Sequence, residues 1–112
     1  MNSVGENWDM DRVAMLTELL AQDPNNAFAR YGLAMEYSNS GEIEQALAEF
    51  QKLLVANPDY TAGYFMAAQT LVKAKRSQDA TQMLEAGIAS ARRKGDGHAE
   101  SEMQAMLEEL SF

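Results

Sequence analysis

The chain has 112 residues, enough for one domain with its own hydrophobic core, and a net charge of −8 from 17 acidic and 9 basic residues. This negative field argues against nucleic-acid binding, which depends on clustered Lys and Arg. Cysteine is absent, which excludes disulfides and thiolate metal sites, and no segment approaches the ~20 apolar residues of a membrane-spanning helix.

Six helices are predicted from the apolar periodicity and from the helix-ending residues between them. The first covers residues 9–22 and ends before Asp23-Pro24, because the residue before proline avoids helical geometry. The others are expected over residues 25–39, 42–56, 59–74, 77–94 and 97–110. Residues 1–8 are expected to be flexible. They lack a basic start followed by an apolar run, so we expect no secretory signal and a cytoplasmic protein.

The chain repeats itself at a spacing of 34 residues. Residues 27–60 align with residues 61–94 without a gap, so that Ala46 falls on Ala80 and Phe50 on Leu84. A fixed period of this size with helical patterning inside it is typical of stacked helical hairpins. We therefore predict a single domain over residues 9–112, in which two repeats are followed by a cap helix over 97–110.

Two of the predicted helices carry a second apolar stripe besides the one that a core requires. These second stripes consist of Phe28, Tyr31 and Met35 in residues 25–39, and of Phe65 and Val72, with Gln69 beside them, in residues 59–74. A surface helix of a compact domain needs only one apolar stripe. The second stripe must therefore face another helix, a ligand or a second copy of the protein.

At these residues the chain resembles a tetratricopeptide repeat protein, of the small stand-alone bacterial type. In residues 27–60 the signature positions hold Leu33, Ala34, Tyr37, Gly41, Ala46, Phe50 and Pro58; in residues 61–94 the match runs through Tyr64, Ala68, Leu71, Ala80 and Leu84. Three positions depart from the pattern. Arg30 stands in place of an aromatic, Arg92 replaces the closing proline, and Lys75 replaces the turn glycine at a cost of ~1 kcal/mol if that position is left-handed.

The resemblance implies an all-α, right-handed stack of helical hairpins, with two full repeats flanked by single N- and C-terminal helices. It also implies an adaptor that binds a peptide or helix of a partner protein in a concave groove. Carried over by position, the groove is lined by Phe28, Tyr31, Met35, Asn39, Phe65, Gln69, Val72 and Lys73. Two alternatives stay open: a homodimer that uses the same groove or the C-terminal helix, and internal packing beneath the cap helix.

The family's carboxylate clamp, which grips acidic chain ends, is missing, because Tyr31, Met35 and Met66 occupy the corresponding places. A groove lined in this way is expected to prefer apolar or amphipathic segments. The two basic clusters, Lys73/Lys75/Arg76 and Arg92/Arg93/Lys94, have two interpretations. They either stabilise helix C-termini or form a docking patch for an acidic partner.

No pattern of catalytic or cofactor-binding residues is present, so we expect a non-enzymatic protein without metal or cofactor. His98 is the only histidine and has no cysteine to complete a metal site with it. Gly95-Asp96-Gly97 matches no phosphate-binding loop, and Asp96 is better explained as the N-cap of the last helix. Core packing is expected for Met15, Met83, Met103 and Met106, and a surface role for Met35 and Met66.

Overall fold

The computed structural model describes residues 4–111, with side chains from residue 11 onward. This part of the chain contains six helices and no strand: α1 Val4–Gln22, α2 Ala27–Asn39, α3 Ile43–Ala56, α4 Thr61–Lys73, α5 Ser77–Lys94 and α6 Gly97–Leu110. Helix α1 begins five residues before its predicted start; the other bounds lie within two residues of the prediction. The flexibility expected for residues 1–8 stays a prediction, and residues 1–3 lie outside the described residues.

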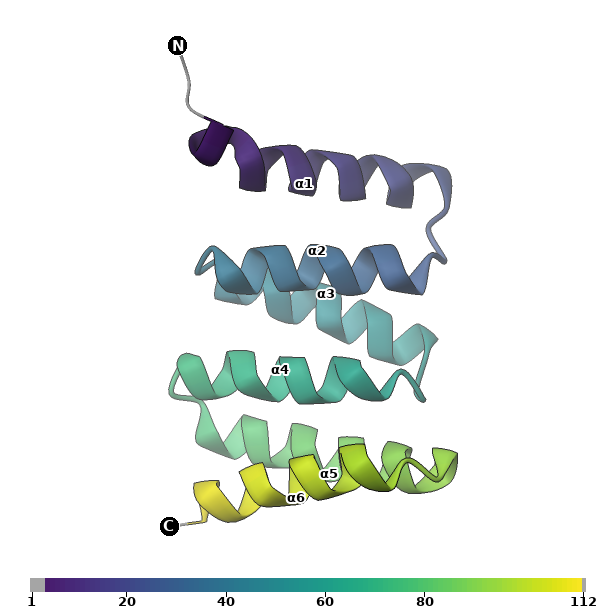
Figure 1. Cartoon of the computed structure of the whole chain (residues 1–112), viewed down its shortest axis with the longest axis vertical. Coiled ribbons are helices and arrows are strands. Elements are labelled where there is room, and N and C mark those ends of the chain that lie inside the picture. Colours follow the sequence, from purple (N-terminus) through teal and green to yellow (C-terminus); the bar gives the residue numbers. More distant parts are fainter. Residues whose placement is uncertain (1–3, 112) are drawn as a thin grey trace.

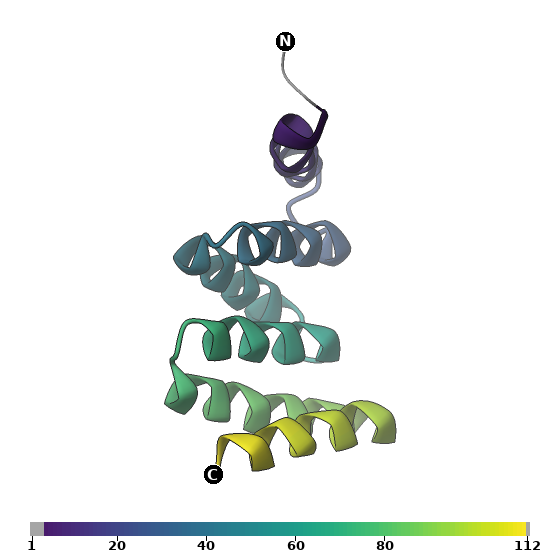
Figure 2. The same ribbon diagram turned by 60° about the vertical axis from the view of Figure 1, so that its left-hand side comes forward.

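The helices stack along one axis, with the two ends of the chain at opposite ends of the stack (Figures 1 and 2). Neighbouring helices run antiparallel, as the short connections require. Helices α4 and α5 begin 34 residues after α2 and α3, whereas α6 begins two residues beyond that frame. Because of this shift, Met103 is buried in α6 while Ser101 and Glu102 are exposed. Helix α6 therefore does not continue the 34-residue frame of the two repeats.

Two side chains cap helix starts, and one of them, Asp96, was predicted to do so. The Asn26 side-chain oxygen accepts a hydrogen bond of 3.0 Å from the Ala29 N–H at the start of α2. The Asp96 carboxylate does the same for the Ala99 N–H at the start of α6, also at 3.0 Å. Each bond satisfies one of the backbone donors that a helix start leaves without an intrahelical partner.

Helices α2, α4 and α5 end in the same left-handed turn, at Gly41, Lys75 and Gly95 with φ of 80°, 61° and 68°. In each turn the following N–H closes a bond to a carbonyl five residues back; the bonds from Glu42 and from Arg76 are each 2.9 Å long. This pattern is the Schellman motif, in which glycine avoids the steric penalty of a left-handed residue. Lys75 therefore occupies a glycine position, as the repeat alignment indicated.

Replacing Lys75 by glycine is expected to raise the free energy of unfolding by about 1 kcal/mol, because it removes the left-handed penalty. The lysine side chain is exposed, so little packing is lost. Urea unfolding followed by circular dichroism measures the change. The reverse change, Gly41→Lys, is the matched control and is expected to destabilise. A Lys75→Gly variant no more stable than the natural chain would contradict this account.

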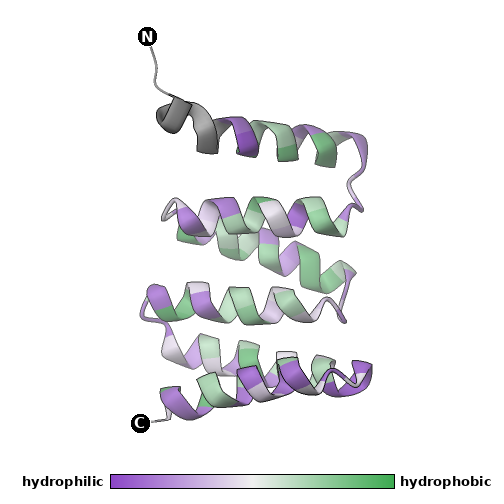
Figure 3. Ribbon diagram, viewed as in Figure 1, coloured by the Kyte–Doolittle hydropathy of each residue, from purple (hydrophilic) through white to green (hydrophobic). Residues whose placement is uncertain are grey.

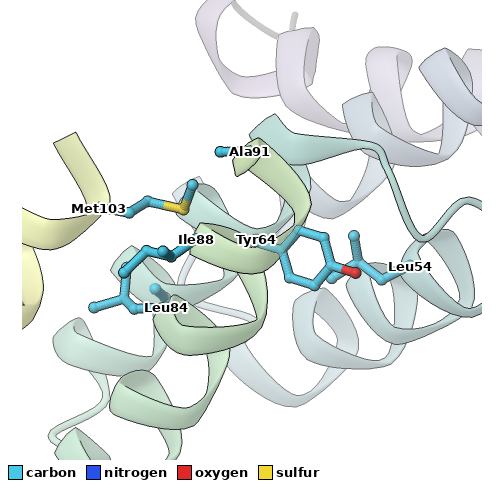
Figure 4. Packing of buried hydrophobic residues seen from close by; sticks show 7 residues of the cluster. Leu54, Tyr64, Leu84, Ile88, Ala91 and Met103 are labelled. Carbon is cyan, nitrogen blue, oxygen red and sulfur yellow. The ribbon is translucent and has the colours of Figure 1, made fainter. Parts of the chain in front are cut away.

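The core runs the length of the stack as three clusters, each shared by neighbouring helices. They join α1 to α2, then α2, α3 and α4, then α3, α4, α5 and α6. Apolar residues alternate with polar ones along the helices in Figure 3, as partly exposed helices require. Figure 4 shows Tyr64 of α4 lying toward Leu54 of α3, and Met103 of α6 near Ile88 of α5.

One core assignment was wrong, because Met15 is 56% exposed on α1. Within residues 4–111, α1 packs on α2 alone, so only one of its faces is covered. Met103, in contrast, is fully buried, and Met83 and Met106 are partly buried against the core clusters.

Candidate functional site

The predicted groove residues lie on α2 and α4, which share one face of the stack while α3 and α5 lie behind them (Figure 1). Four of them are exposed and four are half-buried: Phe28, Asn39, Val72 and Lys73 in the first group, and Tyr31, Met35, Phe65 and Gln69 in the second. Phe28 is 77% exposed, an unusual position for a phenylalanine. The second apolar stripes of α2 and α4 are therefore partly exposed to solvent.

Helix α6 forms a further wall of this face. A hollow of about 290 Å³ lies where Tyr31 and Phe65 meet the first half of α6. Its lining residues are Tyr31, Thr61, Ala62, Phe65, Met66, Asp96, His98, Ala99, Glu102 and Met103. The cap helix therefore packs beside Phe65 and leaves an indentation next to it.

A second hollow, of about 350 Å³, lies further along the same two helices. It is lined by Gln69, Val72, Lys73, Met106, Glu109 and Leu110. The first hollow joins the N-terminal halves of α4 and α6 and the second joins their C-terminal ends, so the two helices run in the same direction. We call the surface of α2, α4 and α6 that contains both hollows the groove.

The structure brings five of the eight predicted residues to these hollows and leaves three outside them. Phe28, Met35 and Asn39 lie on the same face of α2 but border neither hollow. The prediction missed the α6 wall, chiefly His98, Ala99, Glu102, Met106, Glu109 and Leu110. The amphipathic pattern of residues 97–110 was visible in the sequence, but it does not reveal which flank of the helix borders α4.

Tyr31, which lines the first hollow, packs against the ring of Tyr60. The rings of Tyr31 and Tyr60 lie 5.4 Å apart at an angle of 42°, within the range of favourable aromatic contacts. Burial raises the pKa of the Tyr31 phenol above its ordinary value, and the neighbouring Tyr60 raises it further; burial also raises the pKa of Tyr60. Both phenols are therefore neutral at neutral pH and can donate or accept hydrogen bonds.

Buried hydroxyl pairs fix the helices that carry the groove. Ser38 of α2 and Thr70 of α4 share a hydrogen bond of 2.8 Å, and both residues are buried. Thr70 donates its single proton to the Met66 carbonyl, so Ser38 is the donor of the pair. Thr61 of α4 and Ser90 of α5 form a second such bond of 3.0 Å. Because an unpaired buried hydroxyl is costly, each bond restricts the spacing of two helices.

The exposed arginines of the basic clusters already have acidic partners within the chain. Arg76 contacts Glu44 at 3.0 Å and Asp79 at 3.1 Å. Arg93 contacts Asp59 at 2.8 Å, and Arg92 contacts Glu100 at 2.7 Å, which ties α5 to α6. These pairs agree with the structural interpretation of the clusters better than with a docking patch for an acidic partner.

A third hollow, of about 460 Å³, lies on the opposite face of the stack between α3 and α5. Phe50, Tyr64 and Leu71 contribute to it from the core, and Gln51, Asp79 and Gln82 give it a polar border. None of the eight predicted groove residues lines it. Its exposed Val55 makes this face a useful location for control substitutions.

Comparison with known proteins places the chain among helical repeats. Residues 13–64 and 39–109 match the model of a family described as tetratricopeptide repeat. A protein of Pseudomonas aeruginosa named TPR repeat-containing protein is 34% identical over 95 residues, which cover 85% of this chain and 90% of that relative. Both matches span the two repeats predicted from the 34-residue period.

Solved structures agree with the same fold. A tetratricopeptide repeat domain protein from Salinibacter ruber is 32% identical, with a TM-score of 0.73 over 79% of this chain and 89% of that one. The structure of PcrH in complex with the chaperone binding region of PopD has a TM-score of 0.85 at 19% identity, covering 96% of this chain and 81% of that one. Among the residues described here, no helix is long and apolar enough to cross a membrane.

Proposed function

We propose that this chain, which belongs to the tetratricopeptide repeat family, is an adaptor that holds a peptide or helix of a partner protein in the groove of α2, α4 and α6. The family's fold typically serves protein interaction and is not typically enzymatic. The observation that carries the proposal is the position of Tyr31 and Phe65. These two aromatic side chains, each half-buried, line one open hollow from two successive repeats.

The chemistry of this surface suits polypeptide binding. Partly exposed aromatic and methionine side chains offer large apolar contacts, which dominate the energetics of many interfaces. A groove between parallel helices accepts the apolar side of an amphipathic segment. One structural neighbour, PcrH, was solved with the chaperone binding region of PopD, which shows that a related fold binds a segment of another protein.

Replacing Tyr31 and Phe65 together by glutamate is expected to weaken partner binding at least about tenfold, since two apolar anchors are lost and two charges face an apolar contact. The partner is first captured from a native lysate and identified by mass spectrometry. Its affinity is then measured by titration calorimetry with purified proteins. Circular dichroism checks that both variants keep their helicity.

The matched control places the same two charges on the opposite face, with Val55→Glu and Gln82→Glu. Partner affinity close to that of the natural chain is expected for this control. If the groove variant binds as tightly as the control, the groove assignment is wrong. Light scattering tests the homodimer at the same time: a dimer mass that halves only in the groove variant would show that the groove pairs two copies of the chain.

A further inference from the structure

The α6 wall of the groove is acidic. Glu102 borders the first hollow and Glu109 the second, beside the apolar side chains of α4. Asp96 borders the first hollow as well, and its carboxylate accepts the Ala99 N–H. Lys73 is the opposing charge at the far end of α4. Taken together, the two hollows are lined by three carboxylates and one lysine, although the second hollow alone has one of each.

Several carboxylates outside the groove are neutralised by arginines, whereas those that line the groove are not. Glu44, Asp59 and Glu100 are each paired with an arginine. Glu102 lies 3.6 Å from His98, a pair that is charged only when the histidine is protonated, and its side chain is 51% exposed. Between residues 11 and 111, no basic side chain lies within ion-pair distance of Glu109. The groove therefore retains negative charge that a ligand can neutralise.

The spacing of the two glutamates indicates the shape of that ligand. Glu102 and Glu109 are seven residues apart, so they project from one flank of α6 about 10 Å apart along its axis. A second helix presents side chains at the same spacing when its own residues are seven apart. A strand repeats on one side in steps of about 6.8 Å, and multiples of that step do not match 10 Å.

We propose that the partner segment is a basic amphipathic helix that lies along α6, with its apolar side on Tyr31 and Phe65 and with Lys or Arg facing Glu102 and Glu109. This inference rests on the function proposed above and specifies the ligand of that groove. An acidic segment would meet repulsion from this wall. A second copy would bring two acidic walls together, each on a chain of net charge −8. The same charge steers a cationic partner toward the protein.

A selection from random peptides tests the charge and spacing directly. A displayed library of peptides about 16 residues long, enough for roughly four helical turns, is selected on the natural chain at about 0.1 M salt. The selected peptides are expected to be rich in Lys and Arg spaced seven residues apart. Their affinities are then measured by fluorescence anisotropy on purified variants.

The informative variant is Glu102→Gln with Glu109→Gln, for which peptide binding is expected to weaken about fivefold, as two exposed ion pairs would give. The matched control is Glu85→Gln with Glu108→Gln. It removes the same charge from exposed positions on α5 and on the other flank of α6, and a change below about twofold is expected. Equal loss in both variants would attribute the binding to net charge and overturn the inference.

A third variant, Tyr31→Ala with Phe65→Ala, separates this inference from the proposed function. Peptides that lose affinity for this variant but carry no Lys or Arg enrichment would overturn the basic helix and leave the groove in place. Selected peptides that bind all variants equally would overturn both proposals. Basic peptides that need both the aromatic pair and the two glutamates would support both.

Discussion

Replacing Phe50 by alanine is expected to lower the free energy of unfolding by about 3–5 kcal/mol, the range for removing a large aromatic side chain from a core. Phe50 is fully buried in α3, where it packs with Ala34 of α2 and Ala67 of α4. These two alanines offer little side-chain volume to fill the cavity, whereas the flexible Met83, which borders the same hollow as Phe50, can move into part of it. The cost should therefore fall near the middle of the range, at about 4 kcal/mol.

The measurement is urea unfolding of both proteins, followed by circular dichroism. A loss of this size is a large share of the roughly 5–15 kcal/mol that stabilises a typical domain. Val55→Ala on the same helix is the control, because Val55 is 76% exposed, and a change within about 0.5 kcal/mol is expected. If the Phe50 variant lost less than about 1 kcal/mol, the packing described for α2, α3 and α4 would be wrong.

Replacing Gly87 by alanine is expected to destabilise the protein by about 2 kcal/mol. A Cβ atom at this position would lie 2.5 Å from the Met103 sulfur and 2.6 Å from the Tyr64 Cβ. The methionine can move, but the tyrosine Cβ is tied to the backbone of α4, so the helices must separate. Overpacking typically costs about 1–3 kcal/mol, and a clash with an atom tied to the backbone should fall at the upper end of that range. The higher helix propensity of alanine returns about 1 kcal/mol, which leaves a net loss of about 2 kcal/mol.

Gly32→Ala is the matched control in α2. There the added Cβ would meet only the flexible Leu16 side chain, at 3.4 Å, so propensity should dominate and stability should be unchanged or slightly higher. Chemical unfolding of the two variants compares them directly. Equal effects at both glycines would contradict the close approach of α4, α5 and α6. Because the Gly87 change acts on the position of α6, we also expect it to weaken peptide binding in the groove.

Helices α4 and α6 each contribute one face to the core and another face to the groove. Tyr64 faces the core from α4, while Phe65, the next residue, faces the groove. Met103 anchors α6 in the core, and Glu102 beside it borders the first hollow. A change in the packing of either helix therefore alters the width of the groove, which links stability to binding in this protein.

The sequence by itself determined the repeat and most of the helix bounds. The 34-residue period, the prolines after Asp23 and Asn57, and the glycines at 41 and 95 are local signals, and each acts within a few residues of the chain. Local periodicity also identified the second stripes at Tyr31 and Phe65, because a helix fixes the direction of every side chain relative to its neighbours. The alignment of Lys75 with Gly41 identified a turn-glycine position, and the structure shows that Lys75 is left-handed there.

Only the tertiary structure decided how α6 sits against α4, and hence which residues face each other across the groove. Periodicity shows that Met15 and Met103 both lie on apolar faces, but it does not show whether a neighbouring helix covers that face. Met103 is buried because α5 and α4 lie against it, whereas Met15 is exposed because α1 packs on α2 alone. The position of Glu102 and Glu109 beside α4 likewise depends on contacts between helices. Local sequence periodicity does not predict such contacts.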